Sequence, residues 1–222
     1  MLDQLFDIDP QGDVLLVLRR PNLQHLVWGQ AGSDSQKAGN NADPTKEEEV
    51  RFRLSSRHLS LASPVFNAML SGGWKESTMV PQQPGTSANE KAFKNDTDLR
   101  YEITATEWDV KVLALLINII HGRHRQVPHS VDIETLGRFC TLVDYYECHE
   151  TVEFAAHAWI NKLGQALPRT HGRESTIWLL VSWVFSLATT FQKMTELAIR
   201  EGQGPLETMS LPVPPTLLSM DS

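Results

Sequence analysis

The sequence predicts an α+β fold, because short strand-like segments precede a long run of amphipathic helical stripes. The chain has 222 residues, the length of one to two domains. Hydrophobic residues make up 41% of it, which is enough for a core, and charged residues 21%, which is typical of a folded chain.

Three segments have the pattern of β-strands. Residues 13–18 are a short run rich in Val and Leu, residues 50–54 alternate apolar and basic side chains, and residues 99–105 form a third candidate. The polar segments 29–49 and 77–98 contain few large apolar residues, so we expect both to be loop-like inserts. The first insert then makes an overlong hairpin of the first two strands.

Two short helices are predicted after the second strand. Ser56 is a candidate cap for the first, and Ser63-Pro64 places a capping hydroxyl before a proline at the first position of the second. The second helix ends at Gly72-Gly73. The apolar residues that share one face of this helix are Val65, Phe66, Met69 and Leu70.

Longer apolar stripes follow in the rest of the chain. Their spacing of three and four residues predicts helices over 108–120, 136–146 and 152–163, and one long stripe over 180–198. The run 177–188 is too short to span a bilayer. We favour burial of this helix on most sides, and the alternative is that Trp178 and Trp183 form a binding patch.

Composition excludes several functions. The net charge of −7 disfavours nucleic-acid binding, and neither a secretory signal nor a membrane span is expected. Cys140 and Cys148 lie too far apart on one helix for a disulfide, which suits a reducing compartment. Because no nucleophile elbow, phosphate loop or dinucleotide motif occurs, we expect neither an enzyme nor a cofactor. The expected location is cytoplasmic or nuclear.

A basic turn follows the first long helix. His121 and His124 have a spacing compatible with one metal ion, but no Cys or carboxylate accompanies them at ligand spacing. We favour a basic helix end that complements the helix dipole, so no metal site is predicted.

Four stretches carry a resemblance to a known family: "GDVLLVL", "FRLSSRHLSLASPVFNAMLSGGWKES", "LALLINIIHGRHRQVP" and "LVDYYECHETVEFAAHAWI". They resemble the BTB/POZ domain, and more narrowly the fungal BTB-domain proteins. The resemblance implies a small mixed sheet with a cluster of amphipathic helices over 9–162, interrupted by the two inserts. A C-terminal helical extension over 163–201 and a proline-containing tail over 202–222 follow.

Several residues match the family's motif. Asp13 stands where BTB chains place an acid that opens the first strand, and the short-helix signature is matched by Leu59, Ser63, Phe66 and Leu70. One position differs, because many BTB chains carry a histidine eight residues before the serine that Ser63 matches, and Ser55 stands there in this chain.

The resemblance implies a non-catalytic protein-interaction module. BTB domains commonly form homodimers through the first strand and the short helices, so Asp13, Val65, Phe66 and Met69 are candidate interaction residues. Some BTB chains recruit a cullin ubiquitin ligase with an apolar residue, any residue and Glu after the second short helix, and Trp74-Lys75-Glu76 fits that pattern. The function expected is oligomerisation, with a role as a cullin adaptor. The alternative is a transcription-related scaffold without a ubiquitin-ligase role.

Overall fold

The computed structural model describes residues 4–24, 26, 48–72, 77–79, 99–202, 208–209 and 211–212. The chain forms two compact units. The first comprises the described residues of Met1–Leu23, Glu47–Gln126 and Tyr146–Cys148. The second comprises those of Gln24–Lys46, Val127–Tyr145 and His149–Ser222.

The first unit is built on a five-stranded sheet in the order β1-β3-β2-β5-β4. The strands are β1 (Gln4–Asp7), β2 (Val14–Arg19), β3 (Glu49–Leu54), β4 (Ser77–Met79) and β5 (Tyr101–Thr106). β2–β3 and β4–β5 are antiparallel pairs, whereas β1–β3 and β2–β5 are parallel. The sheet is therefore mixed, and together with the helices it confirms the predicted α+β class.

The predicted hairpin of the first two strands is confirmed. β2 and β3 pair from Val14 opposite Leu54 to Leu18 opposite Val50. Phe52 of β3 is fully buried, and its ring stacks on Phe6 with centroids 4.8 Å apart. Most of the insert that joins these strands lies outside the described residues.

Two strands do not follow the sequence prediction. β1 was not expected, and β4 occupies the first three residues of the segment 77–98, which was predicted to be an insert. That prediction is wrong for 77–79, because backbone pairing with β5 places these residues at the edge of the sheet in spite of their short length. Residues 80–98, which form the remainder of this segment, lie outside the described residues.

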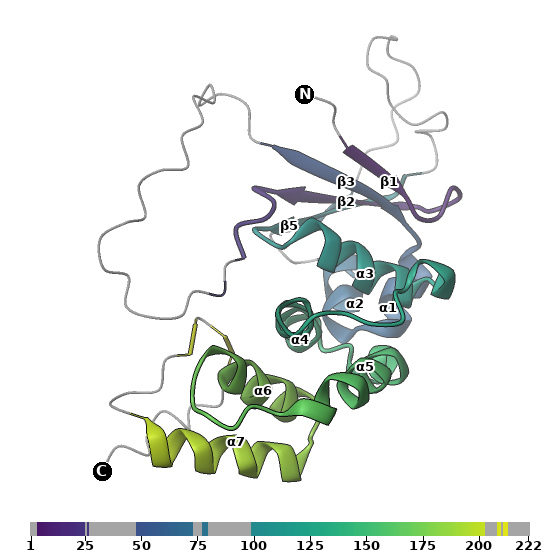
Figure 1. Ribbon diagram of the computed structural model, residues 1–222. Coiled ribbons are helices and arrows are strands. Elements are labelled where there is room, and N and C mark those ends of the chain that lie inside the picture. Colours follow the sequence, from purple (N-terminus) through teal and green to yellow (C-terminus); the bar gives the residue numbers. More distant parts are fainter. Residues whose placement is uncertain are drawn as a thin grey trace, which may run out of the picture. The chain divides into compact units, whose positions relative to one another are not determined.

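Three α-helices of the first unit cover one face of the sheet (Figure 1). They are α1 (Ser56–Ala62), α2 (Pro64–Leu70) and α3 (Val110–Ile120). The short 3-10 helix η2 (His124–Gln126) follows α3. The N-terminus of α3 is capped by Asp109, whose carboxylate accepts the backbone N–H groups of Lys111 and Val112.

Asp13 caps α1 from a distant part of the sequence. Ser55 is the N-cap residue of α1, but its side chain makes no capping bond. The Asp13 carboxylate instead accepts the backbone N–H of Ser56 and its hydroxyl, each at 2.9 Å. The expectation that Ser56 itself caps the helix is therefore wrong, because Ser56 is the first helical residue and donates to Asp13.

We expect Asp13→Ala to lower the free energy of unfolding by about 1–2 kcal/mol, the usual effect of losing a helix cap. Asp13→Asn should cost less, because an amide oxygen still accepts a hydrogen bond but without the charge. Urea denaturation measures both changes. Asp7→Asn on β1 is the control, since Asp7 is exposed. An equal effect of the Asp7 and Asp13 variants would contradict the capping role.

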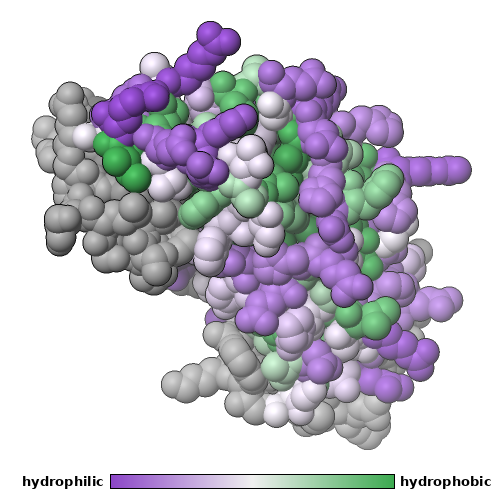
Figure 2. Space-filling view, turned by 90° about the horizontal axis from the view of Figure 1, so that it is seen from below, coloured by the Kyte–Doolittle hydropathy of each residue, from purple (hydrophilic) through white to green (hydrophobic). Residues whose placement is uncertain are grey.

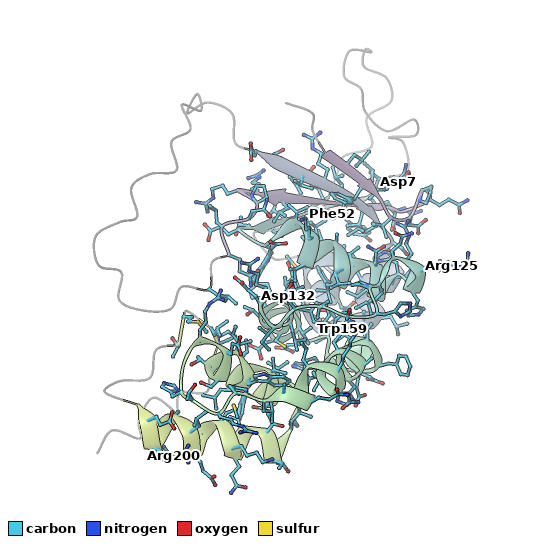
Figure 3. All side chains as sticks on the ribbon, in the orientation of Figure 1. Asp7, Phe52, Arg125, Asp132, Trp159 and Arg200 are labelled. Atoms are coloured by element: carbon cyan, nitrogen blue, oxygen red, sulfur yellow. The ribbon has the colours of Figure 1, made fainter. Side chains whose placement is uncertain are left out.

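The second unit is helical. Its helices are α4 (Ile133–Tyr146), α5 (His149–Leu163), η3 (Gly164–Ala166), α6 (Arg173–Val184) and α7 (Ala188–Glu201). The last residue of α4, Tyr146, is grouped with the first unit. Trp159 of α5, marked in Figure 3, is buried against the edge of the Phe139 ring at 5.3 Å. Its indole N–H donates to the carbonyl of Pro128 at 2.8 Å.

The long stripe predicted over 180–198 is divided between two helices. α6 ends at Val184, and Ser186 adopts a φ of 53°. The backbone N–H of Leu187 bonds the carbonyl of Ser182 at 2.8 Å, a spacing of five residues that closes the helix end. The expectation of one continuous stripe is wrong for this reason.

The C-terminal part is described only at 208–209 and 211–212. Met209 and Leu211 are 7% and 6% exposed, so these two residues of the predicted tail are buried and not solvated. The expected boundary between the BTB-like domain and the helical extension, at residue 162, falls inside the second unit. The division into three domains stays a prediction. None of the helices in the described part is long and apolar enough to cross a membrane.

Candidate interaction surfaces

Ser63 sets the geometry of the two short helices. It ends α1 and begins α2, with Pro64 as the first residue of α2. The Ser63 hydroxyl accepts the backbone N–H of Phe66 at 3.0 Å and donates to the carbonyl of Tyr146. Ser63 is 1% exposed, so this hydroxyl satisfies two backbone groups inside the first unit. The predicted capping role of Ser63 is confirmed.

Two of the candidate interaction residues are core residues. Phe66 is fully buried and stacks on Tyr146, with ring centroids 4.2 Å apart and an interplanar angle of 11°. Met69 is 3% exposed. Phe66 and Met69 are therefore packed inside the first unit and offer almost no surface to a partner, in contrast to their expected role as interaction residues. Val65 is half-buried and keeps part of its side chain accessible.

Asp13 also has a role within the chain. Both oxygens of its carboxylate accept hydrogen bonds from Ser56, and its backbone carbonyl accepts the N–H groups of Arg100 and Tyr101. These contacts join the start of β2 to α1 and to the segment before β5. A carboxylate engaged in this way is occupied as an acceptor, so it stabilises α1 and is a weak candidate for binding a partner.

The motif Trp74-Lys75-Glu76 lies outside the described residues. α2 ends at Leu70 and β4 begins at Ser77, so the motif belongs to the connection between this helix and the edge strand. The candidate roles of Trp74 and Glu76 therefore stay predictions.

Leu61 of α1 is an exposed apolar residue that the sequence analysis missed. Its side chain is 90% exposed, whereas Leu59 of the same helix is fully buried. Two residues correspond to a rotation of about 200° around a helix, so Leu59 and Leu61 point to opposite sides. The spacing of these two residues could have predicted the exposure of Leu61, because a buried Leu59 places Leu61 on the opposite side of the helix.

The other exposed apolar residues are scattered over both units. In the view of Figure 2, exposed apolar side chains form small groups among hydrophilic ones. Among the residues that the structure describes, the large hydrophobic ones with substantial exposure are Leu5, Leu23, Leu61, Tyr145, Phe154, Trp183 and Ile199. Isolated exposed hydrophobic residues are common in folded proteins, so exposure alone does not mark a binding site.

His121, at the C-terminal end of α3, is not the cation that the sequence analysis expected at this helix end. Burial lowers the pKa of His121 from its ordinary 6.5 to about 4. The hydrogen bond to the backbone of Ile117 raises this pKa, and the nearby His58 lowers it further. The ring is therefore neutral near pH 7, and His121 does not complement the helix dipole as a cation. It closes the helix end through a hydrogen bond with the carbonyl of Ile117 at 2.9 Å.

No group of three or more His, Cys, Asp or Glu side chains is placed to hold a metal ion among the residues with described positions. Both cysteines are buried. Burial raises the pKa of the Cys140 thiol and that of Cys148, the latter to about 12. Neither thiol is therefore activated as a nucleophile near neutral pH.

Most of the apolar run 177–188 lies in α6, and this helix is buried on most sides, as favoured. In α6 the residues from Ser175 to Ser182 are all buried, including Trp178 at 3% exposure. Trp183 is 48% exposed, and its ring lies 6.1 Å from that of Phe191 on α7. The alternative of a Trp178–Trp183 patch is thus wrong for Trp178.

No protein-family model matches the chain, and no curated protein matches it.

Proposed function

We propose that this chain is a non-catalytic interaction module of BTB type that forms homodimers through α1 and β1. The support comes from the first unit, in which two short helices joined at Ser63-Pro64 pack with a mixed sheet. The motif residues Leu59, Ser63 and Phe66 are the structural core of that arrangement.

The observation that carries the proposal is the position of the exposed Leu61 on α1, where the resemblance places a dimer contact, since exposure alone does not mark a binding site. The side chain is 90% exposed on α1, the region through which the family that the sequence resembles dimerises. Covering a leucine removes apolar area from water, and full burial of such a side chain contributes roughly 1.5–3 kcal/mol.

β1 offers a second contact for the same partner. It forms one edge of the sheet among the strands in the described part of the chain, and Leu5 in this strand is 45% exposed. A strand at a sheet edge presents backbone groups that pair readily with another chain. A dimer that covers β1 and α1 therefore protects both an open edge and an exposed leucine.

We expect the purified chain to have a mass near 50 kDa in light scattering at tens of micromolar, twice the 25.0 kDa of one chain. Leu61→Asp should raise the dissociation constant at least about tenfold, because it places a charge in an apolar contact. Phe154→Asp on α5 is the matched control, since Phe154 is 92% exposed but lies in the second unit. A monomeric wild type, or equal dissociation by both variants, contradicts the proposal.

A role as cullin adaptor is the more specific part of the proposal. It rests on the match of Trp74-Lys75-Glu76, placed between α2 and β4, to the cullin-binding pattern of the family that the sequence resembles. An aromatic anchor beside an acidic residue is a common combination at interfaces.

We expect Trp74→Ala and Glu76→Ala each to abolish pull-down of a cullin from a lysate of the native cell, with the melting temperature nearly unchanged. Truncation of an aromatic anchor typically costs about 2 kcal/mol or more in binding. Lys75→Ala, at the free position of the motif, is the control. If the wild type binds no cullin, the adaptor role is excluded and the scaffold without a ubiquitin-ligase role takes its place.

A further inference from the structure

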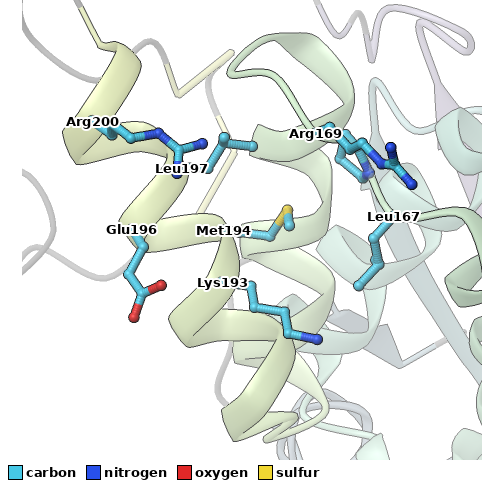
Figure 4. A pocket seen from close by; sticks show the side chains of 8 residues that line it. Leu167, Arg169, Lys193, Met194, Glu196, Leu197 and Arg200 are labelled. Carbon is cyan, nitrogen blue, oxygen red and sulfur yellow. The ribbon is translucent and has the colours of Figure 1, made fainter.

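A cavity of about 360 Å³ lies in the second unit between α7 and the segment 167–169 (Figure 4). Its apolar wall is formed by Leu167, Pro168 and Met194. Leu167 and Pro168 are half-buried, so part of their surface is still open to a ligand. The volume is near the lower end of the range for small-molecule sites, about 300–1,000 Å³, and it suits one or two amino-acid side chains.

Three basic side chains surround this apolar wall: Arg169, Lys193 and Arg200. Arg169 and Lys193 have no ion-pair partner within the described part of the chain. Arg200 pairs with Glu201 at 3.0 Å, but its side chain is 68% exposed. Two cations at the cavity are thus available to a ligand, and a third is in part compensated.

One acidic residue lines the same cavity. Glu196 accepts a hydrogen bond from the Gln192 side chain at 2.8 Å. Figure 4 shows that its carboxylate points away from Leu167 and Arg169 on the opposite wall. The charge that faces the cavity is therefore positive, although the whole chain carries a net charge of −7.

We propose that this cavity binds an acidic peptide segment of a partner protein, with an apolar side chain against Leu167 and Pro168 and carboxylates near Arg169 and Lys193. Carboxylates complement both cations, and the apolar wall selects for a side chain that a simple anion lacks. A nucleic acid is disfavoured because the net negative charge of the chain repels a polyanion at long range. The site stands independently of self-association, because its residues belong to the second unit and Leu61 to the first.

The test uses a phage-displayed library of random seven-residue peptides, selected on the full-length chain. We expect the enriched peptides to carry at least two Asp or Glu residues beside one large apolar residue. A fluorescein-labelled enriched peptide then serves as the probe in fluorescence anisotropy. Lys193→Glu and Arg169→Glu should each weaken its binding about tenfold or more, and added salt should weaken it further.

Lys162→Glu is the matched control, because it makes the same charge change at an exposed lysine in the last turn of α5, outside the cavity. It should change affinity less than about twofold, as expected for a distant exposed charge. Melting temperatures of all variants verify folding. The proposal is overturned if no peptide is enriched, if the enriched peptides lack acidic residues, or if Lys162→Glu weakens binding as much as Lys193→Glu. Displacement of the peptide by phosphatidylserine vesicles or duplex DNA in a Lys193-dependent manner also overturns it.

Discussion

Phe66→Ala should lower the free energy of unfolding by about 3–5 kcal/mol, the usual cost of emptying a buried aromatic site. The Phe66 ring is fully buried and stacks on Tyr146. Its backbone N–H also donates to the Ser63 hydroxyl that begins α2. Removal of the ring leaves a cavity beside this cap, where the two short helices meet. Urea denaturation followed by circular dichroism measures the change.

Val65→Ala on the same helix is the comparison for this experiment. Val65 is half-buried, so its truncation should cost only about 1 kcal/mol. All unfolding curves need the same protein concentration, because the stability of a dimer depends on it. If Phe66→Ala leaves the unfolding midpoint unchanged while the mass in light scattering halves, then Phe66 belongs to the interface and not to the core.

Acidification from pH 7 to pH 4.5 should cost the folded chain about 2 kcal/mol through His121 alone. The backbone N–H of Ser55 donates to Nε2 of His121 at 3.0 Å, so Nε2 carries no proton. Nδ1 is then the protonated nitrogen and donates to the carbonyl of Ile117. A proton on Nε2 removes the acceptor that holds Ser55 at the start of α1, and it places charge beside the stacked His58 ring.

The direction of this effect follows from the two states of the chain. Burial holds the pKa of His121 at about 4 in the folded state, whereas the unfolded side chain takes up a proton near 6.5. The stabilisation is fully present above pH 6.5 and is lost as the pH falls toward 4, because the unfolded state gains a proton that the folded state excludes. The acidic Asp9 raises this pKa and the basic Arg123 lowers it, both weakly.

The experiment compares pH profiles of stability. His121→Gln removes the titrating ring, so its free energy of unfolding should fall by about 2 kcal/mol less than that of the wild type between pH 7 and 4.5. His124→Gln, at an exposed histidine three residues away, should leave the wild-type slope unchanged. Parallel profiles for the wild type and His121→Gln would show that His121 does not control acid stability.

Hydrophobic periodicity predicted most elements because it reports which faces are buried. The alternation of Val50, Phe52 and Leu54 predicted β3, and all three side chains are buried. The break between α6 and α7 was not predictable in this way. Apolar spacing continues across 185–187, and the helix ends through the positive φ of Ser186 and the bond from Leu187 to Ser182.

Edge strands escaped the sequence analysis for a different reason. β1 and β4 have four and three residues, too few for a clear alternation. β1 is a strand because it pairs with β3, and β4 because it pairs with β5. The backbone hydrogen bonds of such a short strand depend more on the neighbouring strand than on its own side chains.

The sequence by itself determined the α+β class, the hairpin of β2 and β3, and the cap at Ser63-Pro64. These features depend on residues close together in the chain or on the alternation of polarity, which a single sequence displays. Only the tertiary structure decided that Phe66 is core and that Asp13 caps a helix that begins 43 residues later. The cavity at Arg169 and Lys193 likewise joins residues 24 positions apart. Such contacts arise from packing between distant segments, and the free energy that selects them appears only when those segments meet.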